Sequence, residues 1–241
     1  MKKVFKYVLL SMAALIVAGG TAFYIWAQQT YEPSQMLQRL AGDAVKEDGW
    51  VLYEPEEKNK AGLIIYPGAK VEPEAYSYIA QQLSKQGYVT GIPEVTLNLS
   101  MLSTNKAEEM IARYPSVEEW YIGGHSLGGV SAASFVHQHS DTTDGLIFLA
   151  SYPSSGSDFS DTNVPVLSIY AEKDGLTTEE KINETKELLS SEKTTFYKIE
   201  GGNHAQFGIY GEQKGDNKAD IPVKEQQDII VRVILDWLQD R

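Results

Sequence analysis

Three polar residues that could act together in nucleophilic catalysis follow three separate apolar runs of the chain: Ser126, Asp174 and His204. Ser126 stands in GHSLGG (residues 124–129), which has the small–x–Ser–x–small form of a sharp turn between a strand and a helix. Such a turn strains the serine backbone and lifts its hydroxyl clear of the sheet. Glycine is needed on either side because a Cβ atom would clash where the strand and the helix close on each other. The motif predicts a nucleophilic serine at position 126.

The aspartate and the histidine each stand in a loop that follows an expected strand. Asp174 lies in AEKDG (residues 171–175), and His204 lies in EGGNHA (residues 200–205). An isolated Asp-Gly usually marks a turn, and an isolated loop histidine is usually solvated, but coincidence at three strand ends is a poor explanation. We therefore predict a Ser126–Asp174–His204 triad, with Glu172 as the alternative acid.

The chemistry of such a triad assigns a role to each residue. A serine hydroxyl is a poor nucleophile unless its proton is removed as it attacks, and a histidine, with an ordinary pKa of about 6.5, can accept that proton near neutral pH. An aspartate holds the imidazole in the required tautomer and stabilises the imidazolium. The developing oxyanion needs two donors. We predict that these are the backbone N–H groups of Leu127 and Ala69, with Gly68 allowing the turn.

Alternating strands and helices must position these loops. We expect strands at residues 50–54, 61–66, 88–92, 117–123, 145–150, 164–170 and 194–199. We expect helices at residues 36–40, 73–87, 103–113, 127–139, 178–189 and 221–238, with Ser103 as a helix N-cap. This alternation predicts an α/β fold with a mostly parallel sheet and helices on both faces. The site should lie beyond the carboxyl ends of the strands.

Composition limits the classes of function. The chain has 241 residues, a net charge of −12 and no cysteine. Without cysteine there is no disulfide, no thiolate metal site and no cysteine nucleophile. An acidic protein lacks the basic surface that neutralises phosphates, so we expect no nucleic-acid partner. The sequence contains no phosphate-binding loop and no metal-ligand cluster, so we expect no cofactor and no metal, and it carries no signal for an oligomeric state.

The first 27 residues have the pattern of a targeting segment. Lys2, Lys3 and Lys6 precede an uncharged run, residues 7–27, which is long enough to span a hydrocarbon core of roughly 30 Å as a helix. We predict that residues 1–27 are an uncleaved signal anchor that places the catalytic domain outside a single-pass cell membrane. The alternative is a cleaved signal peptide and a secreted protein. Residues 28–35 are then a linker, and residues 36–241 form the catalytic domain.

At the three loops the chain resembles the α/β-hydrolase family. GHSLGG resembles the family's nucleophile turn, PVLSIYAEKDG the segment that carries its acid, and KIEGGNHAQFG the segment that carries its histidine. YPGAKVEPEAY, IPEVTLNLS and EGGNHAQFGIYG are similar to a bacterial subgroup related to dienelactone hydrolases. Dienelactone hydrolases proper use a cysteine nucleophile where this chain has Ser126, so the resemblance does not extend to lactone specificity. It implies an α/β-hydrolase fold without a large lid domain.

Together these observations predict a serine hydrolase that cleaves a small carboxylic ester through an acyl-enzyme. Residues 151–163, where many lipases insert a helical lid, are rich in Ser, Gly, Asp and Pro and have no amphipathic pattern. We therefore expect an open site that prefers short acyl groups. Two alternatives stay open: an acyltransferase or amidase with the same triad, and a non-catalytic surface binding protein on a hydrolase fold.

Overall fold

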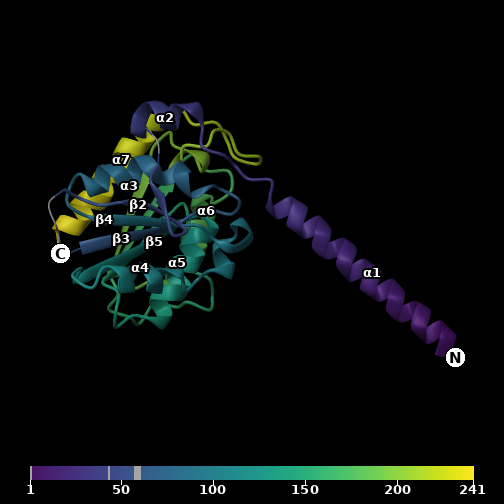
Figure 1. Ribbon diagram of the computed structural model, residues 1–241. Coiled ribbons are helices and arrows are strands. Elements are labelled where there is room, and N and C mark those ends of the chain that lie inside the picture. Colours follow the sequence, from purple (N-terminus) through teal and green to yellow (C-terminus); the bar gives the residue numbers. More distant parts are fainter. Residues whose placement is uncertain (1, 43, 57–60) are drawn as a thin grey trace.

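A long N-terminal helix, α1 (Lys2–Ala27), projects from a sheet that is flanked by helices (Figure 1). The computed structural model describes residues 2–42, 44–56 and 61–241. The strands are β1 (Lys46–Glu47), β2 (Trp50–Tyr53), β3 (Ala61–Tyr66), β4 (Val89–Pro93), β5 (Glu119–His125), β6 (Gly145–Leu149), β7 (Val166–Ala171) and β8 (Thr194–Ile199). The other helices are α2 (Gln35–Ala41), α3 (Ser77–Ser84), α4 (Lys106–Arg113), α5 (Leu127–Gln138), α6 (Glu179–Thr185) and α7 (Val223–Gln239). Short 3-10 helices are η1 (Pro73–Tyr76), η2 (Thr96–Asn98), η3 (Ser100–Leu102), η4 (Lys186–Leu188) and η5 (Ala205–Phe207).

The strands of the described chain form one sheet in the order β1-β2-β4-β3-β5-β6-β7-β8. β1 pairs antiparallel with β2, and β2 pairs antiparallel with β4. From β4 to β8 every neighbouring pair is parallel. This confirms the predicted mostly parallel sheet. Because parallel strands end at the same edge, the loops after β5, β7 and β8 open at one edge of the sheet.

Two hydrophobic cores lie on the two faces of the sheet, and β3 contributes to both. Leu63 and Ile65 belong to the core that contains side chains of α3 and α7. Ile64 and Tyr66 belong to the core that contains side chains of α4 and α5. Since successive side chains of a strand point to opposite faces, the unbroken apolar run AGLIIY buries both sides of the strand. The sheet is therefore covered by helices on both faces, as the sequence predicts.

The helix predicted at residues 103–113 begins later than expected. α4 begins at Lys106, and the residue at its cap position is Asn105. The hydroxyl of Ser103 instead accepts a hydrogen bond from the backbone N–H of Thr96 (3.0 Å) and donates one to the Thr96 hydroxyl (3.0 Å). The prediction of Ser103 as the N-cap is therefore wrong, because its hydroxyl stabilises the preceding η2 turn.

Other element boundaries shift by a few residues. The helix expected at residues 73–87 opens with the 3-10 turn η1 and ends at Ser84. The helix expected at residues 178–189 ends at Thr185 and continues as η4. The strands β3 and β8 have the predicted bounds. Residues 151–163 contain no helix.

α1 is long and apolar enough to cross a membrane, and no charged residue interrupts it after Lys6. A signal sequence near an N-terminus meets the same criterion. Its side chains are exposed along nearly the whole helix, and only Ala27 is buried. The helix therefore packs against the rest of the chain only at its last turn.

Candidate active site

Ser126 occupies a strained turn between β5 and α5. Its backbone has φ 53° and ψ −121°, a combination that is uncommon for a residue with a side chain. A Cβ atom at Gly124 would collide with the backbone of Gly128, and a Cβ atom at Gly128 would collide with the carbonyl oxygen of Tyr66. The glycines on either side of Ser126 are thus required by close backbone approach, as the sequence predicts.

The turn is held in place by hydrogen bonds to the backbone of Ser126. Its N–H donates to the carbonyl of Leu149 at the end of β6 (3.0 Å), and its carbonyl accepts from the N–H of Gly129 (3.0 Å) and from the hydroxyl of Ser151 (2.6 Å). Hydrogen bonds with the end of β6, with Ser151 and with the first turn of α5 therefore keep the strained conformation fixed. Because the backbone groups are occupied, the side-chain hydroxyl is the polar group of Ser126 that is left for chemistry.

His204 and Asp174 form a buried hydrogen-bonded pair. His204 Nδ1 lies 2.8 Å from Asp174 Oδ2, and both side chains are fully excluded from solvent. Asp174 Oδ1 accepts hydrogen bonds from the backbone N–H groups of Leu176 (2.8 Å) and Thr177 (2.6 Å). An ionised carboxylate can only accept, so Nδ1 donates in this hydrogen bond, and in the corresponding neutral tautomer of an imidazole Nε2 is the acceptor.

Glu172, the alternative acid, contacts Gly201 and Lys173 rather than His204. Its Oε2 accepts a hydrogen bond from the backbone N–H of Gly201 (2.9 Å), which lowers the pKa of the Glu172 carboxyl. Its side chain also lies beside Lys173, with Oε1 3.7 Å from the lysine Nζ. The carboxylate that contacts His204 is therefore Asp174.

The residue before Ser126, His125, lies beside the ring of His204. The imidazole rings of His125 and His204 have centroids 4.5 Å apart. Among the described residues, His204 Nε2 has no hydrogen-bond partner although it is buried, so no bond joins it to the Ser126 hydroxyl. A buried acceptor without a partner is costly, and catalytic hydrogen bonds are often long before substrate binds. An unpaired Nε2 beside the nucleophile turn is the arrangement that a general base requires.

His125 belongs to a small network behind the reacting groups that sequence reasoning did not find. The hydroxyl of Tyr76 lies 2.9 Å from His125 Nδ1 and accepts a hydrogen bond from the N–H of Gly68 (2.9 Å). Burial, together with the neighbouring His204, holds the pKa of His125 well below its ordinary value. His125 is therefore neutral and fixes the loop after β3 to the nucleophile turn.

The predicted oxyanion donors lie at the two ends of this network. Ala69 follows Gly68, whose own N–H is already used by Tyr76. In the part of the chain that the structure describes, neither the N–H of Ala69 nor that of Leu127 donates a hydrogen bond to the protein. Leu127 N–H belongs to the first turn of α5, where backbone donors have no partner within the helix. Both groups are thus free to bind an anion.

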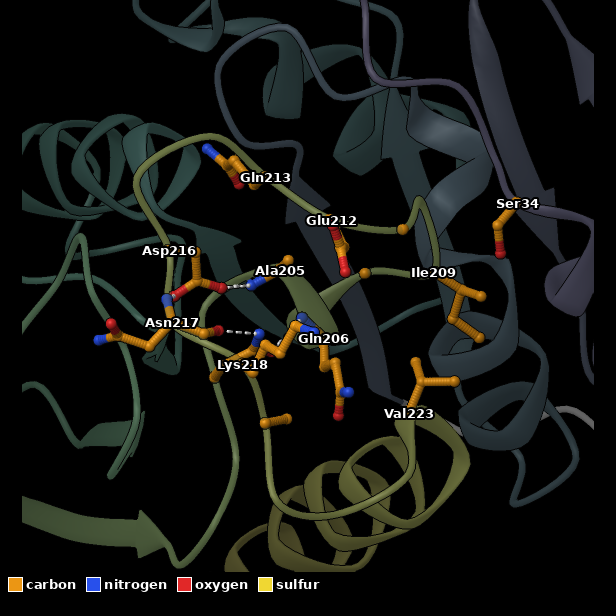
Figure 2. Close-up of a pocket in the computed structure, with 14 residues that line it drawn as sticks. Ser34, Ala205, Gln206, Ile209, Glu212, Gln213, Asp216, Asn217, Lys218 and Val223 are labelled. Carbon is orange, nitrogen blue, oxygen red and sulfur yellow. Dashed lines mark hydrogen bonds between the residues drawn. The ribbon is translucent and has the colours of Figure 1, made fainter.

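Asp216 joins the loop of the acid to the loop of the histidine, and sequence reasoning missed it. Its Oδ1 accepts from the N–H of Gly175, next to Asp174 (3.0 Å), and its Oδ2 accepts from the N–H of Ala205, next to His204 (2.8 Å). The bond to Ala205 is drawn in Figure 2. Because Asp216 is distant in sequence from both loops, no local pattern reveals its role.

A cavity of about 550 Å³ lies beside this carboxylate and is lined by Ala205, Asp216 and Val223 among others (Figure 2). Ser126, Asp174 and His204 are not among its lining residues, so the cavity borders the loop of His204 without including the three residues of the predicted triad. Among the described residues, no group of three or more His, Asp or Glu side chains is arranged to hold a metal ion.

Comparisons with known proteins identify the family and the fold of the chain. The sequence profile of the Alpha/beta hydrolase family matches residues 62–228. No curated protein matches the chain. A predicted CIB-like hydrolase from Thermoplasma acidophilum is similar in structure, with a TM-score of 0.61 and 15% identity over 83% of this chain and 97% of that one.

Two further solved structures resemble the chain. MGS-MChE2, an alpha/beta hydrolase enzyme from a sediment metagenome of the Mar Chica lagoon in Morocco, has a TM-score of 0.61 and 17% identity over 83% of this chain and 99% of its own. A butyrate-bound thermophilic esterase from Thermogutta terrifontis has a TM-score of 0.58 and 10% identity over 79% of this chain and 88% of its own. At these identities the likeness concerns the fold, and it confirms the fold that the sequence predicts.

Proposed function

The chain belongs to the alpha/beta hydrolase family, and from that premise we propose that this hydrolase cleaves carboxylic esters through a serine acyl-enzyme. Ser126 is the nucleophile, His204 the general base and Asp174 the acid that orients it. The single observation that carries the proposal is the buried His204–Asp174 pair: a 2.8 Å hydrogen bond joins Nδ1 to the carboxylate, while Nε2 is without a partner among the described residues.

In the first half of the reaction the Ser126 hydroxyl attacks the ester carbonyl while His204 Nε2 takes its proton. The charge that forms on the carbonyl oxygen is bound by the N–H groups of Leu127 and Ala69. Asp174 stabilises the imidazolium, and its two backbone hydrogen bonds hold the carboxylate in place. His204 then returns the proton to the leaving alkoxide, so the alcohol departs and the acyl group stays on Ser126.

In the second half, water attacks the acyl-enzyme. His204 Nε2 takes a proton from the water, and the same two amides bind the second oxyanion. The Ser126 oxygen leaves with that proton, which restores the free enzyme and releases the carboxylic acid. No step requires a group that the chain does not supply.

Short acyl groups are the substrates that we propose. Residues 151–163 contain no helix that would wall off a long acyl chain. Each methylene that stays in water forgoes roughly 0.8 kcal/mol of burial energy, so a long chain gains little from an open site. The structure of the Thermogutta terrifontis esterase holds butyrate, which is consistent with this substrate range.

A pre-steady-state assay tests the mechanism. Mixing the protein with p-nitrophenyl butyrate should release a burst of p-nitrophenol equal to the concentration of active sites, followed by slower turnover. The matched control is Ser126→Ala, which should fold normally and show neither burst nor turnover above a small residual rate. A burst that persists in Ser126→Ala would remove Ser126 from the mechanism.

For the N-terminal segment we propose a retained membrane anchor with the catalytic domain outside. Ala27, the last residue of α1, is buried against the domain, and its carbonyl accepts a hydrogen bond from the Asn98 side chain (3.0 Å). A cleaved leader would lose this contact. The full chain should stay with membranes through a carbonate wash, and a soluble form starting near Gln28 would contradict the anchor.

A further inference from the structure

The last turn of α1 is docked on the loops that follow β3 and β4. Ala27 is 0% exposed, and its carbonyl accepts the hydrogen bond from Asn98 Nδ2. The ammonium of Lys70 lies 4.6 Å from the centre of the Trp26 ring, within the range of a cation–π contact. The helix is therefore attached to the domain at its end rather than through a free tether.

The residues after α1 continue this attachment along the backbone. The N–H of Tyr31 donates to the carbonyl of Lys70 (2.6 Å), and the carbonyl of Tyr31 accepts from the N–H of Glu72 (3.1 Å). The hydroxyl of Thr30 donates to the carboxylate of Glu72 (2.9 Å). Because both backbone and side-chain bonds join the linker to the loop beside Ala69, the direction of α1 is fixed relative to the candidate site.

The length of α1 sets the depth of these loops in a membrane. Residues 7–27 carry no charge and at 1.5 Å per residue span about 30 Å, which is the thickness of a bilayer's hydrocarbon core. Ala27 then lies at the outer boundary of that core. The headgroup layer extends roughly 5–7 Å farther, and the Asn98 amide lies 3.0 Å from the Ala27 carbonyl. An α1 that spans the bilayer upright would place Asn98 within the headgroup layer.

The loop that carries Asn98 has a surface suited to that layer. Residues 95–105, which we call the η2–η3 loop, contain no charged residue, although the chain as a whole has a net charge of −12. Met101 and Leu102 are 58% and 53% exposed. Lipid phosphates repel acidic surfaces, whereas exposed apolar side chains gain by leaving water for the interface. The loop itself is uncharged, although Glu94, Glu108 and Glu109 border it together with Lys106, and its exposed apolar side chains lie near the end of the anchor.

The η2–η3 loop is also close to the candidate site. The hydroxyl of Ser100 donates to the carbonyl of Pro67 in the loop that contains Ala69 (2.6 Å). The loop's 3-10 turn η3 packs on α5, the helix that begins directly after Ser126. The backbone N–H of Lys70, next to Ala69, donates to the carbonyl of Asn98 (2.8 Å). Residues 67–70, which include the predicted oxyanion donor Ala69, are therefore joined directly to the η2–η3 loop.

We propose that the η2–η3 loop rests on the outer surface of the membrane that holds α1, with Met101 and Leu102 in the headgroup layer. The proposal rests on the retained anchor of the proposed function. It places residues 67–70, which contact the η2–η3 loop and include the predicted oxyanion donor Ala69, close to the membrane surface.

Depth-dependent quenching tests the proposal on the full chain, and the chain has no cysteine of its own. Leu102→Cys and Asp141→Cys are labelled separately with an environment-sensitive fluorophore and reconstituted into phosphatidylglycerol vesicles that contain a lipid with a nitroxide on its headgroup. Asp141 is the matched control: it is exposed and follows α5 at its far end, about 18 Å from the Ser126 turn at 1.5 Å per residue. Intact-mass measurement first establishes that each labelled protein retains α1.

At position 102 we expect about a twofold or larger loss of fluorescence on adding the nitroxide lipid, because the label lies in a layer only roughly 5–7 Å thick. At position 141 we expect the same fluorescence in vesicles with and without the nitroxide lipid. Equal quenching at the two positions, or a chain from which α1 has been removed, would overturn the proposal. Hydrolysis of a water-soluble ester, measured on the same samples, reports separately on the proposed function, since quenching does not depend on activity.

Discussion

Replacing Asp174 with asparagine should leave the fold intact and remove nearly all activity, for a reason that lies in its hydrogen bonds. Oδ1 of Asp174 accepts from the N–H groups of Leu176 and Thr177, at 2.8 and 2.6 Å. An asparagine keeps both bonds only if its carbonyl oxygen takes this place. Turning the amide around would give up two hydrogen bonds, at about 0.5–1.5 kcal/mol each. The asparagine NH₂ group therefore faces His204.

An NH₂ group facing Nδ1 reverses the tautomer of His204. Nδ1 must then accept, so the proton of the neutral ring moves to Nε2, which can no longer take the proton of Ser126. Loss of the correct tautomer in a serine triad lowers kcat by about ten-thousand-fold, which corresponds to about 5.4 kcal/mol of transition-state stabilisation. The thermal midpoint should change little, because both backbone bonds survive.

The assay is kcat/KM on p-nitrophenyl butyrate, together with thermal unfolding of the same preparations. Glu172→Gln is the matched control, since that carboxylate bonds to Gly201 N–H and should keep near-normal activity. In a His204→Ala background, Asp174→Asn should cost almost nothing further, because both residues act through the imidazole. If Asp174→Asn kept activity within tenfold of the parent, or if Glu172→Gln caused the large loss, the assigned roles would be refuted.

Three further outcomes follow from the same geometry. The pKa of His125 is well below its ordinary value in the folded protein, so unfolding takes up a proton in acid. The thermal midpoint should therefore fall as the pH drops below about 6.5, and it should fall less steeply in His125→Gln. The same dependence of the thermal midpoint on pH in both proteins would contradict this. Asp216→Asn should lower kcat by about ten- to hundredfold with little change in KM, and destabilise the fold by about 1–3 kcal/mol, because the single side-chain oxygen of asparagine can accept from Gly175 N–H or from Ala205 N–H but its NH₂ group then faces the other donor; a rise in KM alone would point to a substrate contact instead. Across p-nitrophenyl esters, kcat/KM should fall from acetate and butyrate towards decanoate, and the rate should not rise abruptly above the substrate's solubility limit. An optimum at long chains would reveal an apolar surface in the site that binds a long acyl chain.

Local patterns in the sequence predicted most of the fold. Runs such as AGLIIY are apolar without interruption and are bounded by turn residues, so β3 has the predicted bounds. The start of α4 could not be predicted from Ser103, because its hydroxyl bonds to Thr96 only after the chain between them has folded into η2 and η3. Helix caps depend on such competing partners, whereas buried strands depend on composition alone.

The residues of the candidate site also differ in how far the sequence could predict them. Ser126, Asp174 and His204 could be proposed from the sequence because each follows its own expected strand, and in the structure the last two share a hydrogen bond. Asp216 escaped detection because its two partners lie on other loops and are backbone N–H groups, which leave no trace in the residue types. The contact of Ala27 with Asn98 is likewise tertiary, so the orientation of the anchor could not be deduced from hydropathy.

The measurement that tests the central claim most directly is the site of covalent modification by a fluorophosphonate probe, mapped by mass spectrometry on the full chain. A single adduct on Ser126 is expected, absent in Ser126→Ala and formed far more slowly in Asp174→Asn, because the probe needs the same activated hydroxyl as an ester does. An adduct on another serine, or undiminished labelling of Ser126→Ala, would contradict the assignment of Ser126 as the nucleophile.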